Sequence, residues 1–373
     1  MRIALLCDSP DEHWPSMDIV GEMLARHLPE NPNLQPEQVL LPIRRLTPNL
    51  IVNRVLFRFL DYPRWVRRNS HRFDVFHIVD HSYSQLAHSL PPERTVITCH
   101  DIDTFRSVLD PARDPRSPLF RTMTRRILTG LQLAAHVACD SAATLTDLER
   151  HGVLPAARMS VVPLGTHPSC SPNPDPDSDR EAAALLGPAG HIDILHVGST
   201  MPRKRIDFLL RVFAEVTEDA NRELPRLRLL RVGGPFTAEQ AALAADLGIT
   251  NSLLVLPFLN RAVLASVYRS AALVLLPSDA EGFGLPVTEA MACGTPVLAS
   301  DLPVLREVGG NAASYAPAGD IAAWSSALRS LLNERSHHPD RWLGRKQIGL
   351  NQAKLFSWTN YSNSMANVYN RLL

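Results

Sequence analysis

Residues 276–301 read LPSDAEGFGLPVTEAMACGTPVLASD. The apolar run that ends at Leu276 predicts a buried strand, and the small and polar residues after it predict a loop. Pro286 is suited to the first turn of a helix, where no intrahelical hydrogen bond needs its missing N–H. Gly282 and Gly284 allow the loop backbone to approach a ligand closely. We therefore predict a strand, a loop that contacts a ligand, and a helix, in this order.

The start of this helix is suited to bind an anion. Glu281 precedes it in the loop, and Glu289 lies about one turn inside it. The first N–H groups of a helix have no partner within the helix, and the helix dipole places partial positive charge there. We expect two carboxylates beside a bound phosphate to hold sugar hydroxyls. In the alternative interpretation, Glu281 is solvated and Glu289 only caps the helix. The backbone N–H groups expected to bind the phosphate are those of Leu285, Val287 and Thr288.

The sequence on either side repeats the order of strand and helix. This alternation predicts an α/β fold with two doubly wound parallel sheets, which bind ligands at the carboxyl ends of their strands. In the first half we expect strands at 2–7, 75–79, 95–99, 135–139 and 159–163, and helices at 15–28 and 141–151. In the second half we expect strands at 192–197, 227–232, 253–256, 272–276 and 296–299, and helices at 205–218, 237–247, 261–270, 286–293 and 320–333.

The length of 373 residues corresponds to about 2.5 domains of roughly 150 residues, so two domains are expected. The segment 167–190 contains five prolines and many small polar residues, which is typical of a linker. We therefore predict an N-terminal domain over 1–168, a linker over 169–190 and a second domain over 191–355. The apolar and aromatic residues of 356–373 fit a helix that need not belong to the domain before it.

Composition excludes several classes of protein. The chain is 45% hydrophobic and 20% charged, as globular proteins are, so a disordered or fibrous chain is excluded. Lys and Arg number 38, as do Asp and Glu, and this balance disfavours a nucleic-acid-binding protein. No apolar run approaches 18 residues, and Asp8 interrupts the apolar start, so neither a membrane-spanning helix nor a signal peptide is expected. Five widely spaced cysteines (7, 99, 139, 170 and 293) indicate reduced thiols in a cytoplasmic protein.

One region is strongly basic despite the balanced total. Between Arg44 and Arg72 the only acidic residue is Asp61, and apolar and aromatic residues are interspersed. Such a surface could dock on anionic lipid at the inner face of the plasma membrane, or on a polyanionic acceptor. The alternative is a solvated or ion-paired surface. The eight arginines of this region are at 44, 45, 54, 58, 64, 67, 68 and 72.

The stretch 276–301 closely resembles the signature of the retaining nucleotide-sugar glycosyltransferases of family 4. Their GT-B fold consists of two facing Rossmann-like domains. The resemblance covers nearly the whole chain, most specifically 190–310. HVGSTMPRKRIDFLL at 196–210 resembles the family's phosphate-binding strand and loop, and 257–275 its nucleoside-side loop and helix. Residues 139–144 and 161–165 resemble the segments that close the first domain, and 356–373 resembles the helix that crosses back onto it.

The resemblance implies transfer of a hexosyl unit from a nucleoside-diphosphate sugar to an acceptor hydroxyl, without a metal or other cofactor. It implies that Glu281 contacts the transferred sugar and that Glu289 binds the ribose. Lys204 would offset the charge on the departing diphosphate, and a fixed cation in this place lowers the barrier. The other residues implied in donor binding are Gly284, Leu285, Val287, Thr288, Gly198, Ser199, Arg203 and Phe258.

The sequence departs from the family pattern in two loops. Many relatives carry Arg directly after the glycine of the phosphate loop, where this chain has Ser199; Arg203 or Arg205 could take over its role. Many relatives also carry a glycine pair in the first loop, where this chain has DSPDEHWPSM. Ser16 and the N–H groups near Met17 could serve there, at a helix start on the acceptor side.

His100 is the candidate catalytic residue of the first domain. It directly follows an expected strand and resembles the family's histidine near the reacting sugar. It could bind a sugar hydroxyl or stabilise developing positive charge; alternatively it is a structural histidine bonded to backbone. His77 and His81 superficially suggest a metal pair, but a strand over 75–79 would not place them on one helical face, so no metal is expected.

Other functions remain open at this point. A nucleotide-sugar epimerase or a phosphorylase would share the two-domain architecture. A phosphorylase needs a lysine for pyridoxal phosphate, and the lysines at 204, 346 and 354 offer no convincing candidate. The rival from another class is a non-catalytic protein that binds a nucleotide sugar, because a fold does not determine a function.

Overall fold

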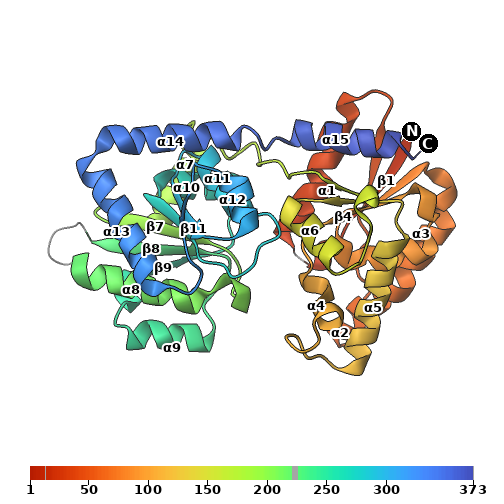
Figure 1. Cartoon of the computed structure of the whole chain (residues 1–373), viewed down its shortest axis with the longest axis horizontal. Coiled ribbons are helices and arrows are strands. Elements are labelled where there is room, and N and C mark those ends of the chain that lie inside the picture. Colours follow the sequence, from red (N-terminus) through yellow and green to blue (C-terminus); the bar gives the residue numbers. More distant parts are fainter. Residues whose placement is uncertain (13, 221–225, 373) are drawn as a thin grey trace. The chain divides into compact units, whose positions relative to one another are not determined.

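The computed structural model describes residues 1–12, 14–220 and 226–372 (Figure 1). The chain forms two compact units. Unit 1 comprises Met1–Gly165 together with Ser357–Leu373, and unit 2 comprises Thr166–Phe356. Each unit is built around its own six-stranded sheet, so each has a separate core.

Unit 1 contains a parallel sheet with the strand order β2-β1-β3-β4-β5-β6. Its central strands are buried along their whole length, as expected for a parallel sheet covered on both faces. The strands are β1 (Arg2–Leu6), β2 (Gln35–Val39), β3 (Val75–Ile78), β4 (Thr95–Cys99), β5 (His136–Cys139) and β6 (Met159–Val161). The helices are α1 (Pro15–His27), α2 (Leu50–Leu56), α3 (Tyr62–Asn69), α4 (Arg106–Leu109), α5 (Pro118–Leu133), α6 (Ala142–Arg150) and α15 (Trp358–Asn370).

The last helix, α15, returns to unit 1 and lies against α1 (Figure 1). Its aromatic residues Trp358, Tyr361 and Tyr369 are buried. The Tyr369 hydroxyl lies 2.7 Å from Nδ1 of His77 on β3, and the Tyr361 hydroxyl lies 3.2 Å from the Thr98 hydroxyl on β4. The C-terminal segment is therefore part of the core of unit 1.

Unit 2 contains a second parallel sheet with the order β12-β11-β10-β7-β8-β9. The strands are β7 (Ile192–Val197), β8 (Leu227–Val232), β9 (Leu253–Leu256), β10 (Leu273–Leu276), β11 (Val297–Ser300) and β12 (Ser314–Ala316). The helices are α7 (Pro176–Leu186), α8 (Ile206–Ala220), α9 (Ala238–Asp246), α10 (Arg261–Ser270), α11 (Leu285–Ala292), α12 (Pro303–Gly309), α13 (Ile321–His337) and α14 (Pro339–Ala353). The two sheets confirm the predicted α/β fold.

The strand order reverses once in each sheet. In unit 1 the first strand, β1, lies between β2 and β3, and in unit 2 the first strand, β7, lies between β8 and β10. Loops that follow neighbouring strands diverge at such a reversal, so ligands bind there. The loop after β7 and the loop after β10 contain the residues singled out in the sequence.

Several elements were not predicted. The edge strand β2 has the polar sequence QPEQV, and an edge position tolerates its proline and its partly exposed side chains. Residues 176–186, within the expected linker, form α7, which is capped by Asp175 and packs against α10 in unit 2. The prolines of 167–190 therefore do not prevent a helix, because Pro176 occupies its first turn. None of the helices in the described part of the chain is long and apolar enough to cross a membrane.

Candidate functional site

The candidate site of unit 2 lies at the carboxyl ends of β7 and β10. These strands pair in parallel, with Ile194 opposite Leu273, so the loops that follow them leave the same edge of the sheet. The loop after β7 continues through a short 3-10 turn over Pro202–Lys204 into α8. The loop after β10 leads into α11. The topology thus places two segments far apart in sequence beside each other.

Lys204 and Glu281 meet at this edge. The Lys204 ammonium donates to both carboxylate oxygens of Glu281, at 2.6 and 2.8 Å. The side chain of Lys204 is 10% exposed and that of Glu281 6%. The predicted catalytic lysine and the predicted sugar-binding glutamate are therefore direct partners, although 77 residues separate them in the sequence.

Two further groups hold the Glu281 carboxylate. The Ser278 hydroxyl donates to Oε1 at 2.6 Å, and the Arg203 guanidinium lies 3.4 Å from Oε2. Burial by itself would raise the pKa of Glu281, but Lys204 and Arg203 outweigh it and hold that pKa below its usual value. Glu281 is therefore ionised at neutral pH and balances part of the positive charge of the loop.

The helix α11 begins directly after position 284, which only glycine suits. Gly284 has φ of 97°, and a Cβ built on it would lie 2.7 Å from Cδ2 of Leu305. Leu285 is the first helical residue, as the proline at 286 predicts. The expectation for Val287 is corrected, because its N–H donates to the Gly284 carbonyl at 2.9 Å within the first turn. The side chain of Thr288 is buried, and its hydroxyl donates to the Leu285 carbonyl at 3.0 Å.

Glu289 lies one turn further along α11. Its Oε2 accepts a hydrogen bond from the buried Tyr268 hydroxyl of α10 at 2.9 Å. Burial raises the pKa of Glu289, while this hydrogen bond and the charge of Arg261 act against the rise. Tyr268 therefore fixes the position of the carboxylate expected to bind the ribose.

The remaining predicted donor residues differ in exposure. Ser199 is exposed, and Phe258 is 75% exposed. Gly198 is half-buried; the side chains of His196 and Lys204 would be the nearest to a Cβ placed on it. Of the two arginines expected to replace the family's arginine, Arg203 contacts Glu281. Arg205 instead pairs with Asp207 and Asp279, at 3.2 and 3.1 Å.

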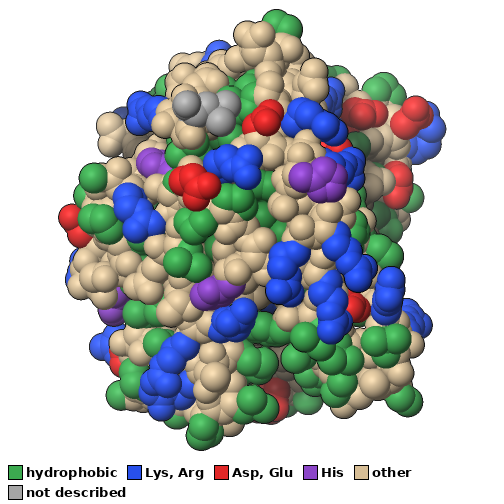
Figure 2. Space-filling model, turned by 90° about the vertical axis from the view of Figure 1, so that its right-hand side faces the viewer, with side chains coloured by type: hydrophobic (Ala, Val, Ile, Leu, Met, Phe, Trp, Pro, Cys, Tyr) green, Lys and Arg blue, Asp and Glu red, His purple; other side chains and the backbone are tan. Residues whose placement is uncertain are grey.

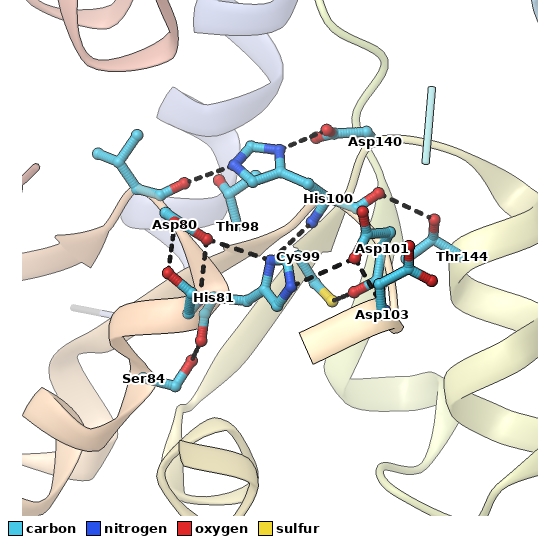
Figure 3. Close-up of polar contacts among 12 residues, drawn as sticks. Asp80, His81, Ser84, Thr98, Cys99, His100, Asp101, Asp103, Asp140 and Thr144 are labelled. Atoms are coloured by element: carbon cyan, nitrogen blue, oxygen red, sulfur yellow. Dashed lines mark hydrogen bonds and ion pairs between the residues drawn. The ribbon is translucent and has the colours of Figure 1, made fainter. Parts of the chain in front are cut away.

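In unit 1, His100 lies directly after β4 in a buried polar cluster (Figure 3). Its Nδ1 lies 2.6 Å from an oxygen of Asp140, and its Nε2 lies 2.9 Å from the Val79 carbonyl oxygen. Burial alone would lower the pKa of His100, but Asp140 outweighs it and raises that pKa to about 9. With both ring nitrogens next to acceptors, His100 is held as an imidazolium. Its bond to the Val79 carbonyl is the kind of backbone contact that the alternative interpretation of His100 expected.

The second histidine of this cluster is His81. Its Nδ1 accepts the His100 backbone N–H at 3.3 Å, and its Nε2 lies 3.6 Å from Asp101 (Figure 3). Asp80 follows β3 and lies 3.4 Å from the His81 ring. Asp8 follows β1, and burial and the nearby Asp80 carboxylate raise its pKa well above the usual value. The carboxyl ends of β1, β3 and β4 thus form an acidic and histidine-rich edge.

The predicted acceptor-side residues lie in the first turn of α1. Ser16 is exposed and Met17 is half-buried. The Met17 N–H donates to the Trp14 carbonyl oxygen at 2.9 Å, so this N–H is already used within the turn. The helix start therefore offers fewer backbone donors to a ligand than the sequence suggested.

His77 is a structural residue. Its ring nitrogens lie 2.7 Å from the Tyr369 hydroxyl and 2.8 Å from the Thr98 hydroxyl, and burial lowers its pKa to about 3. Among the residues that the structure describes, no group of three or more His, Cys, Asp or Glu side chains has the arrangement of a metal site.

Sequence reasoning missed three polar residues of these two edges. Ser278 and Asp140 are small polar residues in loops, and nothing in their local pattern distinguishes them from other turn residues. Arg231 had a detectable signal, because it is a charged residue near the end of the otherwise apolar strand sequence LRLLRV. A charged side chain in a strand buried on both faces requires a specific reason.

Two protein-family models match the chain. The model described as Glycosyl transferases group 1 matches residues 177–345, and the model described as Glycosyltransferase Family 4 matches residues 19–169. The first match lies within unit 2, and the second lies in unit 1 except for its last four residues, 166–169, which belong to unit 2.

Curated relatives include proteins named D-inositol 3-phosphate glycosyltransferase. That of Gordonia bronchialis is 33% identical over 228 residues, which are 58% of this chain and 48% of the relative. That of Mycobacterium tuberculosis is 33% identical over 235 residues, which are 60% of this chain and 45% of the relative. The matched part of the chain therefore spans about half the length of these relatives.

Solved structures with the same fold include three proteins of low sequence identity. Sucrose-phosphate synthase from Thermosynechococcus elongatus has a TM-score of 0.78 and 20% identity, and covers 100% of this chain and 99% of its own. HepE of Anabaena, in complex with UDP and glucose, has a TM-score of 0.77 and 18% identity and covers 100% of both chains. The lipopolysaccharide-biosynthesis glycosyltransferase WaaG has a TM-score of 0.74 and 15% identity, with 99% of both chains covered.

Proposed function

This chain belongs to glycosyltransferase family 4, within the group 1 glycosyl transferases of GT-B fold, and from that membership we propose that it is a retaining glycosyltransferase. It transfers a hexosyl unit from a nucleoside-diphosphate sugar to an acceptor hydroxyl. We assign the donor to unit 2 and the acceptor to unit 1. Polysaccharide or cell-envelope biosynthesis is the proposed context, since WaaG is described as acting in lipopolysaccharide biosynthesis.

The observation that carries this proposal is the contact between Lys204 and Glu281 at the strand reversal of unit 2. Breaking a glycosyl–phosphate bond leaves negative charge on a phosphate oxygen, and a fixed ammonium nearby stabilises that charge. The carboxylate that holds the ammonium in place can also accept hydrogen bonds from sugar hydroxyls. A lysine and a glutamate in direct contact at a ligand-binding edge serve both purposes.

The proposed reaction keeps the configuration of the anomeric carbon. The acceptor hydroxyl attacks from the face that the diphosphate leaves, the glycosyl–phosphate bond breaks, and the leaving phosphate oxygen takes the acceptor proton. Atoms and charge balance without any further reactant. Lys204, Arg203 and the start of α11 supply positive charge, so we propose that the reaction needs no metal ion.

The donor is proposed to carry a nucleoside diphosphate. Support comes from HepE, a structural neighbour described in complexes with UDP and with UDP-glucose. Glu289, fixed by Tyr268 on α11, is the proposed ligand of the ribose. Phe258 is the proposed contact of the base because an exposed aromatic side chain can stack on it.

A thermal-shift screen against UDP, GDP, ADP and their sugars tests the donor class. A nucleotide at 100 times its dissociation constant should stabilise the protein by about 2.7 kcal/mol. The matching sugar nucleotide should then be hydrolysed slowly, with and without EDTA, and Glu281→Ala should abolish hydrolysis. The anomeric configuration of the released sugar, followed by NMR, tests retention. If no nucleotide of the screen stabilises the chain, the proposed function is wrong.

The alternative is a non-catalytic protein that binds a nucleotide sugar. It shares every binding feature of the site, so binding alone does not separate the two. A wild-type protein that binds a sugar nucleotide but neither hydrolyses it nor transfers its sugar would favour this alternative. Interconversion of the donor into an epimer without release of the nucleotide would favour an epimerase.

We also propose that the protein is cytoplasmic and that its basic region 44–72 binds anionic lipid at the inner face of the plasma membrane. Leu46, Leu50 and Ile51 are 64%, 62% and 72% exposed. Arginines 44, 45, 54, 64, 67 and 68 are exposed, whereas Arg58 and Arg72 pair with Glu12 and Glu37. Figure 2 shows basic side chains next to exposed hydrophobic ones on one face of the molecule. The arginines of such a surface can pair with anionic lipid headgroups, and its exposed apolar side chains can enter the acyl-chain region below them.

Sedimentation with lipid vesicles tests this membrane proposal. The double variant Arg67→Gln/Arg68→Gln should bind vesicles that contain phosphatidylglycerol about 10- to 30-fold more weakly, because each basic residue contributes about 1 kcal/mol. Ile51→Glu should weaken binding further. Leu343→Glu is the matched control, since Leu343 of unit 2 is also exposed, at 63%. Equal binding to vesicles of phosphatidylcholine alone would contradict the proposal.

A further inference from the structure

Arg231 is a buried arginine on β8, and its guanidinium lies 5.5 Å from the centre of the Phe236 ring. Its residue exposure is 1%. The Nη1 donates to the Gly198 carbonyl oxygen at 3.1 Å, while Nε and Nη2 have no hydrogen-bond partner. Within the part of the chain that the structure describes, no carboxylate pairs with this guanidinium. One carbonyl and one aromatic ring do not balance a buried charge that has no carboxylate partner, so the presence of Arg231 requires another explanation.

Arg228 on the same strand shows what a structural arginine looks like here. Its Nε and Nη2 lie 2.7 and 2.9 Å from the two oxygens of Asp193, and its Nη1 donates to the Leu186 carbonyl at 2.7 Å. The guanidinium therefore has partners on all three nitrogens. Arg231 differs in that two of its three nitrogens lack one.

Arg231 lies next to the loop of the candidate site. In the parallel pairing of β7 and β8, Arg231 is the register partner of His196, so both side chains leave the same face of the sheet. The Nε2 of His196 has no hydrogen-bond partner, and it would lie 3.2 Å from a Cβ placed on Gly198. The side chain of Lys204 would lie 3.7 Å from the same Cβ. Gly198 is therefore surrounded by His196, Lys204 and Arg231.

The backbone around Gly198 is closely packed on this side. Gly233, which follows β8, has φ of 125°, and a Cβ on it would lie 2.0 Å from the Gly198 carbonyl oxygen. Any side chain at position 233 would displace the loop. The close approach of the two glycine backbones thus keeps the carbonyl of Gly198 within reach of Arg231.

The charges around this loop do not cancel. Lys204 and Arg203 both contact the carboxylate of Glu281, whereas Arg231 contacts no carboxylate among the residues that the structure describes. Burial lowers the pKa of Arg231 to about 10, and lowers that of His196 to about 4. At neutral pH the arginine is therefore charged and the histidine is neutral. The Arg231 guanidinium therefore adds positive charge beside the loop at a buried position, where little water screens it.

We propose that Arg231 is a binding and positioning residue for the diphosphate of the donor: its buried charge, together with Lys204, attracts the anion to the Gly198 loop. Its hydrogen bond to the Gly198 carbonyl holds the loop in the binding conformation. Arg231 thereby adds to the charges of Lys204 and Arg203 a further positive charge, which neither Ser199 nor the paired Arg205 offers. The inference rests on the proposed function, because it concerns the ligand of the same site.

Isothermal titration of wild type, Arg231→Lys and Arg231→Gln tests the proposal. The probes are UDP, GDP and ADP, their monophosphates and nucleosides, and inorganic pyrophosphate. Arg231→Gln should weaken binding of the diphosphates and of pyrophosphate by about 10- to 100-fold and leave nucleoside binding unchanged, as expected for the loss of one charged contact. Arg231→Lys keeps the charge and should retain most of the affinity for the diphosphate.

Arg228→Gln is the matched control, and stability without ligand is the second readout. Arg228→Gln breaks a complete ion pair, so it should lower the melting temperature without changing the ratio of diphosphate to nucleoside affinity. Arg231→Gln removes an unpaired buried charge, so its melting temperature without ligand should be unchanged or higher. A merely structural Arg231 predicts the opposite, namely a destabilised Arg231→Gln with an unchanged affinity ratio.

The outcomes separate this inference from the proposed function. If wild type binds a nucleoside diphosphate and Arg231→Gln binds it equally well, the inference is wrong and the function stands. If wild type binds pyrophosphate through Arg231 but no nucleoside diphosphate, the anion site stands and the function is wrong. If wild type binds none of the probes, both are wrong.

Discussion

Glu281 and His100 are both buried side chains that keep their charge through a neighbour of opposite sign. Lys204 and Arg203 outweigh burial for Glu281, and Asp140 outweighs it for His100. Glu281 contacts Lys204 and Arg203 at a ligand-binding edge of the sheet, whereas both ring nitrogens of His100 already face acceptors of the protein. At the scale of the residue, Glu281 is thus the better candidate for contact with substrate, and His100 also stabilises unit 1.

The pairing of His100 with Asp140 predicts a pH-dependent stability. The folded pKa of His100 is about 9 and its ordinary value is 6.5, so its stabilising contribution is complete below pH 6.5 and is lost as the pH rises towards 9. The free energy of unfolding, from urea denaturation followed by tryptophan fluorescence, should therefore fall over this range. In Asp140→Asn the fall should largely disappear. The prediction fails if wild type and Asp140→Asn lose equal stability between these two pH values.

At the scale of the element, the start of α11 depends on one backbone conformation. Gly284 adopts φ of 97° directly before the helix, and Leu305 of α12 occupies the space that a side chain at 284 would need. The position of α11 in turn sets the places of Leu285 and Glu289 relative to the loop that carries Glu281. A small change at 284 therefore affects both the packing of unit 2 and its candidate site.

Gly284→Ala should lower the stability of the protein by about 1–3 kcal/mol and weaken nucleotide binding. The cause is twofold: alanine disfavours this φ, and its Cβ would lie 2.7 Å from Leu305. Gly248→Ala is a suitable control, because Gly248 has φ of 68° but nothing within 4 Å of the added Cβ. Thermal unfolding and nucleotide titration of both variants provide the measurement. Equal effects of the two substitutions would show that the contact with Leu305 is unimportant.

At the scale of the whole molecule, the chain completes unit 1 only with its last helix. Residues 1–165 form the sheet, but Tyr361 and Tyr369 of α15 fill its core and bond to Thr98 and His77. Unit 2 lies between these two parts of the sequence and has its own sheet and its own core. The two units therefore have separable sources of stability.

Deletion of 357–373 should destabilise unit 1 selectively. The deletion removes the hydrogen bonds of Tyr361 and Tyr369 and their packing against β3 and β4 of unit 1. It removes no such contact from the described part of unit 2. Hydrogen exchange followed by mass spectrometry should show faster exchange in 1–165 and unchanged exchange in 166–356. A synthetic peptide of 357–373 added in excess should slow exchange in unit 1 again. Uniformly faster exchange in both units would contradict the separation.

Local sequence patterns were sufficient to predict the α/β fold class, which the two parallel sheets confirm. Buried parallel strands are continuous apolar runs, and helix starts have local signals such as Pro286 and Gly284, so these features can be recognised without tertiary information. Glu281 and Lys204 were singled out because the segments that contain them, 276–301 and 196–210, resemble the signature segments of the family. The polar edge strand β2 and the helix α7 were missed because their local sequences indicate loops.

Which side chains share an environment depends on the tertiary structure. Lys204 meets Glu281, and Arg231 meets Gly198, because β7 lies between β8 and β10 in the sheet. Likewise, His100 is hydrogen-bonded to Asp140 because β4 and β5 end at the same edge of the sheet. Strand order and register bring together residues tens of positions apart, and they also determine which charges remain unpaired. Local sequence patterns carry no record of this order, since it follows from the packing of the whole sheet.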